Sequence, residues 1–141
     1  MSPLRQISKQ RVPEPTEVEL EILAVLWRIG PSTVRQVHLV LAAEKGTGYS
    51  TTLKMMQVMR EKGLLLRDDS VRPQVYRPAA SQERTQLQLL DGLVQKAFNG
   101  SALRLLLSAL SAKRVSPQEL AEVEQIIQQA KQRQPRPGRK A

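Results

Sequence analysis

The stretch STVRQVHLVLAAEKGTGYSTTLKMMQVMREKG, residues 32–63, decides the fold. Apolar side chains recur at helical spacing in two segments of it, 32–43 and 50–62. Between them, Glu44–Gly48 holds two glycines and is typical of a turn. Ser32 is a favourable N-cap for the first segment. The pattern predicts a helix-turn-helix.

The segments on either side complete a small domain. Thr16–Glu19 is a capping box that begins an earlier helix, which Gly30 followed by Pro31 ends. Leu64–Leu66 and Gln74–Arg77 are expected to pair as two short strands, which Pro78 stops. We therefore predict a mainly α fold with a small β-hairpin, a winged helix-turn-helix domain over residues 14–78.

The chain changes character after Pro78 and is expected to form a helical dimerisation domain over residues 81–131. Ser81, Ser101 and Ser116 are predicted to cap three successive helices. The middle helix is apolar on too many faces to be exposed on a monomer, and a second copy of the chain is the simplest partner. The expected interface residues are Leu87, Leu90, Val94, Leu103, Leu106, Leu107, Leu110, Leu120, Val123 and Ile127.

Charge indicates a polyanionic partner. The chain has a net charge of +9, and much of the excess lies in an expected flexible basic arm, 1–13, and an expected disordered basic tail, 132–141. Residues 45–77 add seven basic groups against three acidic ones. The predicted domain therefore has one half that is suited to contact with the phosphates of nucleic acid.

Hydroxyl and cationic side chains in the predicted domain fit a DNA interface. The N-terminal end of the helix at 50–62 would meet base edges or phosphates, and arginines of the hairpin would reach the backbone or minor groove. Arg72, in the hairpin turn, is the best candidate for this contact. For Arg67 and Arg77, a role in the scaffold of the hairpin is the other interpretation. The expected contact residues are Ser32, Thr33, Arg35, Tyr49, Ser50, Thr51, Thr52, Lys54, Met55, Arg72 and Arg77. The competing interpretation is that the serine and threonine residues only cap helices.

The sequence offers no chemistry of an enzyme. There is no cysteine, and His38 is the single histidine, so no metal site, cofactor or thiol nucleophile is expected. Asp68 and Asp69 are interpreted as turn residues, and Trp27 as a core residue. No nucleophile elbow or phosphate-binding glycine motif is present. No apolar run is long enough to span a bilayer, which predicts a cytoplasmic protein without membrane insertion.

Three runs resemble the penicillinase repressor family of bacterial regulators, the BlaI/MecI type. They are PTEVELEILAVLWRIGPSTVRQVHLVL at 15–41, GYSTTLKMMQVMREKGLLLRD at 48–68 and QVYRP at 74–78. The resemblance extends over residues 14–131 and is most specific in the winged-helix half. It implies a homodimer that binds a palindromic operator on double-stranded DNA through the winged helices and dimerises through the C-terminal helices.

The resemblance also implies a release signal. Members of this family repress an operon until a membrane sensor protease triggers cleavage in the C-terminal domain, which the resistance regulators undergo at an Asn-Phe bond. The matching position here is Ser108-Ala109, so cleavage by the same specificity does not follow. The absence of cysteine excludes the cysteine-based copper response of other relatives. A ligand-responsive winged-helix regulator and a winged-helix protein-interaction module remain as alternative functions.

Overall fold

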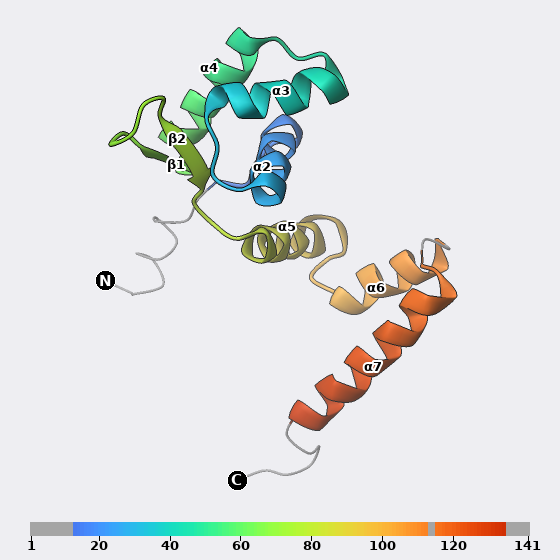
Figure 1. Ribbon diagram of the computed structural model, residues 1–141. Coiled ribbons are helices and arrows are strands. Elements are labelled where there is room, and N and C mark those ends of the chain that lie inside the picture. Colours follow the sequence, from blue (N-terminus) through green and yellow to red (C-terminus); the bar gives the residue numbers. More distant parts are fainter. Residues whose placement is uncertain (1–12, 113–114, 135–141) are drawn as a thin grey trace, which may run out of the picture. The chain divides into compact units, whose positions relative to one another are not determined.

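The computed structural model describes residues 13–112 and 115–134, so most of the expected arm and tail lies outside the described residues. The chain divides into two compact units, the first ending at Asp91 and the second beginning at Gly92. In chain order (Figure 1), the helices and strands are α2 (Glu17–Ile29), α3 (Val34–Lys45), α4 (Tyr49–Glu61), β1 (Leu65–Asp68), β2 (Val75–Pro78), α5 (Gln82–Ala97), α6 (Ala102–Ser111) and α7 (Pro117–Arg133).

Helix α2 begins and ends where the sequence predicts. The Glu19 backbone N–H donates to the Thr16 hydroxyl oxygen at 3.2 Å, and the Thr16 N–H donates to the Glu19 carboxylate at 2.9 Å. At the other end, Gly30 has a φ of 89° and donates its N–H to the Leu26 carbonyl at 2.8 Å. A positive φ is favourable for glycine alone, and it turns the chain towards α3.

The predicted cap of α3 is wrong by one residue, because Thr33 and not Ser32 is the N-cap. The Thr33 hydroxyl accepts from the Gln36 N–H at 3.2 Å. Ser32 is held elsewhere: its backbone forms an antiparallel bridge with Tyr76 of β2, and its hydroxyl donates to the Gly30 carbonyl at 2.8 Å. This bridge connects the start of the helix-turn-helix to the hairpin.

The core of the first unit lies between α2, α3, α4 and the hairpin. Figure 1 shows these three helices grouped beside the two strands. Trp27 packs against this core as predicted. The buried apolar side chains are Ile22, Leu23, Val25, Leu26, Val34, Val37, Leu41, Met56, Met59, Leu64, Leu65 and Tyr76. Helix α4 thus has one face inside the protein, which fixes the direction in which its other face points.

Strands β1 and β2 form an antiparallel hairpin, in register from the pair Leu65 and Pro78 to the pair Asp68 and Val75. Both strands lie about one residue further along the chain than the sequence predicts. Each contains alternately buried and exposed residues: the ring of Tyr76 is buried in the core, and Arg77 is exposed. The fold is a winged helix-turn-helix, as predicted.

The first unit continues beyond Pro78, where the sequence analysis places its end. The indole N–H of Trp27 donates to the Ala80 carbonyl at 3.2 Å, and the Ala79 N–H donates to the Leu64 carbonyl at 2.9 Å. Thr85, at the end of the first turn of α5, is buried. The boundary at Asp91 therefore lies inside a continuous helix.

The second unit contains the end of α5 together with α6 and α7. The Ser101 and Ser116 hydroxyls accept from the N–H groups of Arg104 and Glu119, both at 3.1 Å, which confirms the predicted caps. Helix α7 continues to Arg133, so the expected disorder from residue 132 is wrong for its first two positions. Within the described ranges, no helix is both long and apolar enough to cross a bilayer.

Candidate nucleic-acid interface

The outer face of α4 begins with side chains that the sequence predicted there. Ser50, Thr51 and Lys54 are all exposed. The N-cap of this helix is Gly48, and no side chain of the described residues caps the first turn. The N–H groups at the start of a helix have no partner within the helix and carry partial positive charge, so this end suits a phosphate oxygen.

Two predicted contact residues are internal. Ser32 and Thr52 are 3% and 0% exposed, and the Thr52 hydroxyl donates to the Gly48 carbonyl at 3.2 Å. Met55 is half-buried against the core. The Thr33 hydroxyl is engaged in the cap of α3. We correct the interface accordingly, since buried hydroxyl groups and a core methionine do not present contact atoms to a ligand.

Gln57 is an exposed residue of α4 that the sequence analysis missed. It follows Ser50 by seven residues, which is about two helical turns, so it lies on the same outward row as Ser50 and Lys54. The signal was available, because the inward row of Thr52, Met56 and Met59 fixes the opposite face. A glutamine amide can bond to an adenine edge with two hydrogen bonds, so its position suits base recognition.

Tyr49 stands at the start of α4 and is 44% exposed. Its ring meets His38 of α3 edge to face, with 5.5 Å between the ring centroids. His38 Nδ1 is buried without a hydrogen-bond partner among the described residues. The contact fixes the tyrosine ring while part of it remains open to solvent. Arg35, in the first turn of α3, is also exposed.

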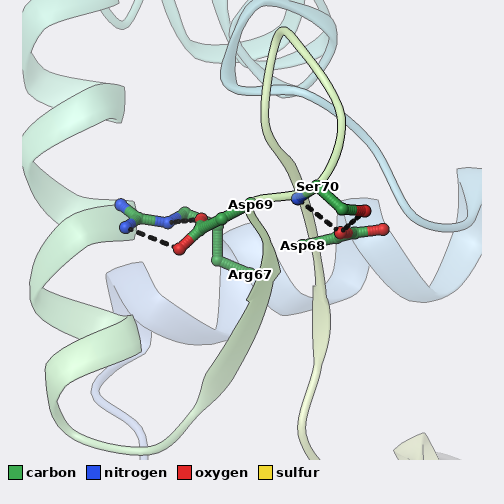
Figure 2. A network of polar contacts seen from close by, with 4 residues as sticks. All are labelled: Arg67, Asp68, Asp69 and Ser70. Carbon is green, nitrogen blue, oxygen red and sulfur yellow. Dashed lines mark hydrogen bonds and ion pairs between the residues drawn. The ribbon is translucent and has the colours of Figure 1, made fainter.

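The side chains of two aspartates organise the hairpin turn (Figure 2): Asp69 lies in the turn as predicted, whereas Asp68 is the last residue of β1. The Asp68 carboxylate accepts from the Ser70 hydroxyl and from its N–H, the latter at 2.9 Å. These bonds to Ser70 lower the pKa of Asp68, and the nearby charge of Arg77 lowers it further. The carboxylate is therefore charged across the neutral range and holds the turn in one conformation.

The arginines of the hairpin differ in their freedom. Arg67 forms a two-point ion pair with Asp69, which raises the pKa of the guanidinium, so Arg67 is held as part of the hairpin. Arg72 and Arg77 are exposed, and neither forms an ion pair within the described part of the chain. These two arginines are the cations of the hairpin that are available to a phosphate.

A partly buried ion pair lies at the opposite end of α4. Lys62, the C-cap of this helix, donates to the Glu19 carboxylate of α2 at 2.7 Å. The Glu19 side chain is 2% exposed and that of Lys62 is 39% exposed. Burial alone raises the pKa of Glu19, but hydrogen bonds from Lys62 and from the Thr16 backbone outweigh it, and the pKa is lowered. The pair joins α4 to α2 behind the exposed face.

The second unit carries most of the apolar side chains predicted for dimerisation. Helices α6 and α7 have no buried residue among their described side chains. Leu103 is 64% exposed and Leu107 is 53% exposed. Val94 is an exception, because it is 7% exposed and packs within the chain, so we remove it from the expected interface. Leu93 and Ile126, which the sequence analysis did not include, are 47% and 58% exposed.

The part of the chain that is described contains no group of three or more metal-ligating side chains. The features that recur around α4 are instead an open helix start, hydroxyl groups, an amide and exposed cations. Together, the fold and this surface define a winged helix-turn-helix protein with an exposed polar and cationic face along α4 and the hairpin.

Comparison with known proteins identifies its family. The sequence model described as penicillinase repressor matches residues 15–129, and the chain belongs to this family. The family consists of DNA-binding regulators and not of enzymes. The chain is 32% identical to the transcriptional regulator BlaI of Mycobacterium tuberculosis over 87 residues, which cover 60% of this chain and 63% of that protein. It is also 23% identical to the penicillinase repressor of Bacillus licheniformis over 124 residues, covering 88% and 97% of the two chains.

Proposed function

We propose that this protein is a transcriptional repressor that binds a palindromic operator as a homodimer. The observation that carries the proposal is the open N-terminal end of α4, with exposed Ser50, Thr51 and Lys54 and no side-chain cap. The names of the relatives, a transcriptional regulator and a penicillinase repressor, support it.

In the proposed complex, α4 enters the major groove and the hairpin follows the neighbouring backbone. Ser50, Lys54 and the first N–H groups bind phosphate, while Gln57 reads a base edge. Arg72 lies along the backbone or in the minor groove beside it. Arg35 and Tyr49 add contacts to the phosphates next to the helix. This assignment uses only side chains that are exposed in the first unit.

The dimer is proposed from the leucines of the second unit. Helix α6 buries none of its described residues, although five of its ten residues are leucine. Apolar surface of this kind is stable in water only when another surface covers it. A second copy would place two α4 helices at half-sites about 34 Å apart, one turn of DNA. Because the two contacts are linked, the dimer binds far more tightly than one protomer does.

Repression in this proposal is steric, since a dimer on an operator near a promoter excludes polymerase. Release follows loss of the dimer, and a membrane sensor protease that leads to cutting of α6 would be one trigger. Ser108 and Ala109 lie inside α6 and are exposed in the single protomer. Insertion of a specific protease site there tests the step: cutting should lower operator affinity to that of a protomer. Undiminished affinity after complete cutting would contradict this route of release.

The reading surface is tested by fluorescence anisotropy with duplexes from the region upstream of the gene, over a series of salt concentrations. The combined substitution Thr51→Ala and Lys54→Ala should weaken binding and reduce the dependence of log K on log salt by about 1 for the lost phosphate contact. Arg84→Ala is the matched control, because this exposed arginine lies on α5 outside the proposed interface. Unchanged binding in the double variant would eliminate α4 as the reading helix.

A further inference from the structure

Helix α7 has an apolar stripe, and none of its side chains is fully buried within the described part of the chain. Leu120, Ile126 and Ile127 are 41%, 58% and 39% exposed, and Val123 and Ala130 are half-buried. At 100° per residue, these five side chains lie on one face of the helix. A helix with such a face packs against another apolar surface.

The charges beside the stripe are arranged in a specific order. Glu124 and Lys131 are seven residues apart, about two turns, and lie on one flank of the stripe. Glu122 and Arg133 are eleven residues apart, about three turns, and lie on the other flank. On each flank the acid is towards the N-terminus and the base towards the C-terminus. None of the four forms an ion pair with any residue in the described ranges.

The two acid–base pairs have the same midpoint, which lies between Ile127 and Gln128. When a two-fold axis relates two antiparallel helices, each flank faces the same flank of the partner, and positions equally far from the axis lie opposite each other. A single antiparallel register centred at this midpoint therefore places both acids opposite bases. In a parallel pair each flank faces the other flank, so Glu124 would face the partner's Glu122, and Lys131 would face the partner's Arg133.

We propose that α7 packs antiparallel against α7 of a second copy of this chain, with the two-fold axis beside Ile127. Glu124 then pairs with the partner's Lys131, and Glu122 pairs with the partner's Arg133. The apolar stripes supply the attraction, and the charges select the orientation and the register. This inference rests on the homodimer in the proposed function and specifies how one of its contacts is built.

The test uses the full chain and a charge-exchanged variant that carries Glu122→Lys, Glu124→Lys, Lys131→Glu and Arg133→Glu together. In the antiparallel register this variant pairs with itself as the wild type does. A mixed dimer would instead set acid against acid and base against base at four places. One protein is isotopically labelled, the two are mixed as dilute monomers and concentrated, and native mass spectrometry counts the three dimers. We expect mixed dimers at about one-tenth of the random proportion or less, since each exposed pair changes the equilibrium by a factor of about 1.5 to 5.

Each other outcome is decisive. Mixed dimers above the random proportion would mean that α7 packs parallel, and a random mixture would mean that these flanks do not meet; both overturn the inference while the homodimer stands. A wild type that remains monomeric at all concentrations overturns the proposed homodimer itself. Circular dichroism checks that the variant keeps its helix content. Exchange of Glu83 and Arg84 on α5 is the matched control and should give random mixing, because both are exposed in the first unit.

Discussion

Removing either partner of the partly buried pair Glu19 and Lys62 should destabilise the first unit by unequal amounts. Lys62→Met leaves a carboxylate that is 2% exposed and still accepts from the Thr16 N–H, without its cationic partner. Breaking a fully buried pair in this way costs about 3–5 kcal/mol. Because the Lys62 side chain is 39% exposed, water reaches the pair, and we expect a smaller loss of about 2–3 kcal/mol.

Glu19→Gln should cost less, about 1–2 kcal/mol, because the amide oxygen still accepts from Thr16 and Lys62 can turn into solvent. The double variant should lose less than the sum of the two single losses, since it leaves no unpaired charge. Urea unfolding at neutral pH measures these differences, with fluorescence of Trp27, the single tryptophan, as the probe of this unit. Equal losses for the two single variants, or strictly additive losses, would refute the idea that a poorly solvated carboxylate is being neutralised.

Three further predictions concern the same unit. The lowered pKa of Glu19 contributes stability that is fully present above the unfolded-state pKa of 4.5 and is lost as the pH falls through the folded-state pKa. The free energy of unfolding should therefore depend less on pH between these values in Glu19→Gln than in the wild type. An identical pH dependence in the two proteins would contradict the assignment. Thr33→Ala should lower the free energy of unfolding in urea by about 1 kcal/mol through loss of the cap of α3. A loss below about 0.3 kcal/mol would mean that the Thr33 hydroxyl does not stabilise the helix. Asp69→Ala should release Arg67 and loosen the turn, seen as faster amide hydrogen exchange at residues 69–74, whereas unchanged exchange would show that Asp68 and Ser70 suffice.

The elements of the first unit were predictable because local chemistry and core packing agree. The capping box at Thr16 and the glycine at position 30 fix both ends of α2, and the apolar spacing of α3 and α4 gives their inner faces correctly. The cap of α3 was missed because Ser32 and Thr33 are equally good caps in sequence. Pairing of Ser32 with Tyr76, which lies far away in the chain, decides between them.

The proposed DNA-contacting face was predictable only in part, for a related reason. Ser50, Thr51 and Thr52 are similar in sequence, but the helix turns the third of them into the core, where its hydroxyl returns to the Gly48 carbonyl. Gln57 was missed because attention to cations and hydroxyls overlooks an amide at the correct spacing. The end of the first unit was misplaced because Pro78 looks like a boundary, whereas the contacts of Ala80 and Thr85 carry the unit into α5.

Because the first unit ends at Asp91, inside α5, a fragment that stops between the hairpin and α5 does not contain the whole unit. Shortening the chain at Pro78 would remove the Ala80 carbonyl, which accepts from the Trp27 indole N–H. It would also remove the buried Thr85 and expose the surface that this residue covers. The smallest fragment that retains the contacts of the first unit must therefore keep the first turns of α5. It then also contains Leu87 and Leu90, which are 64% and 43% exposed. Such a fragment would keep this exposed apolar surface and tend to self-associate, because the end of the first unit and two residues of the proposed dimer interface lie on the same helix.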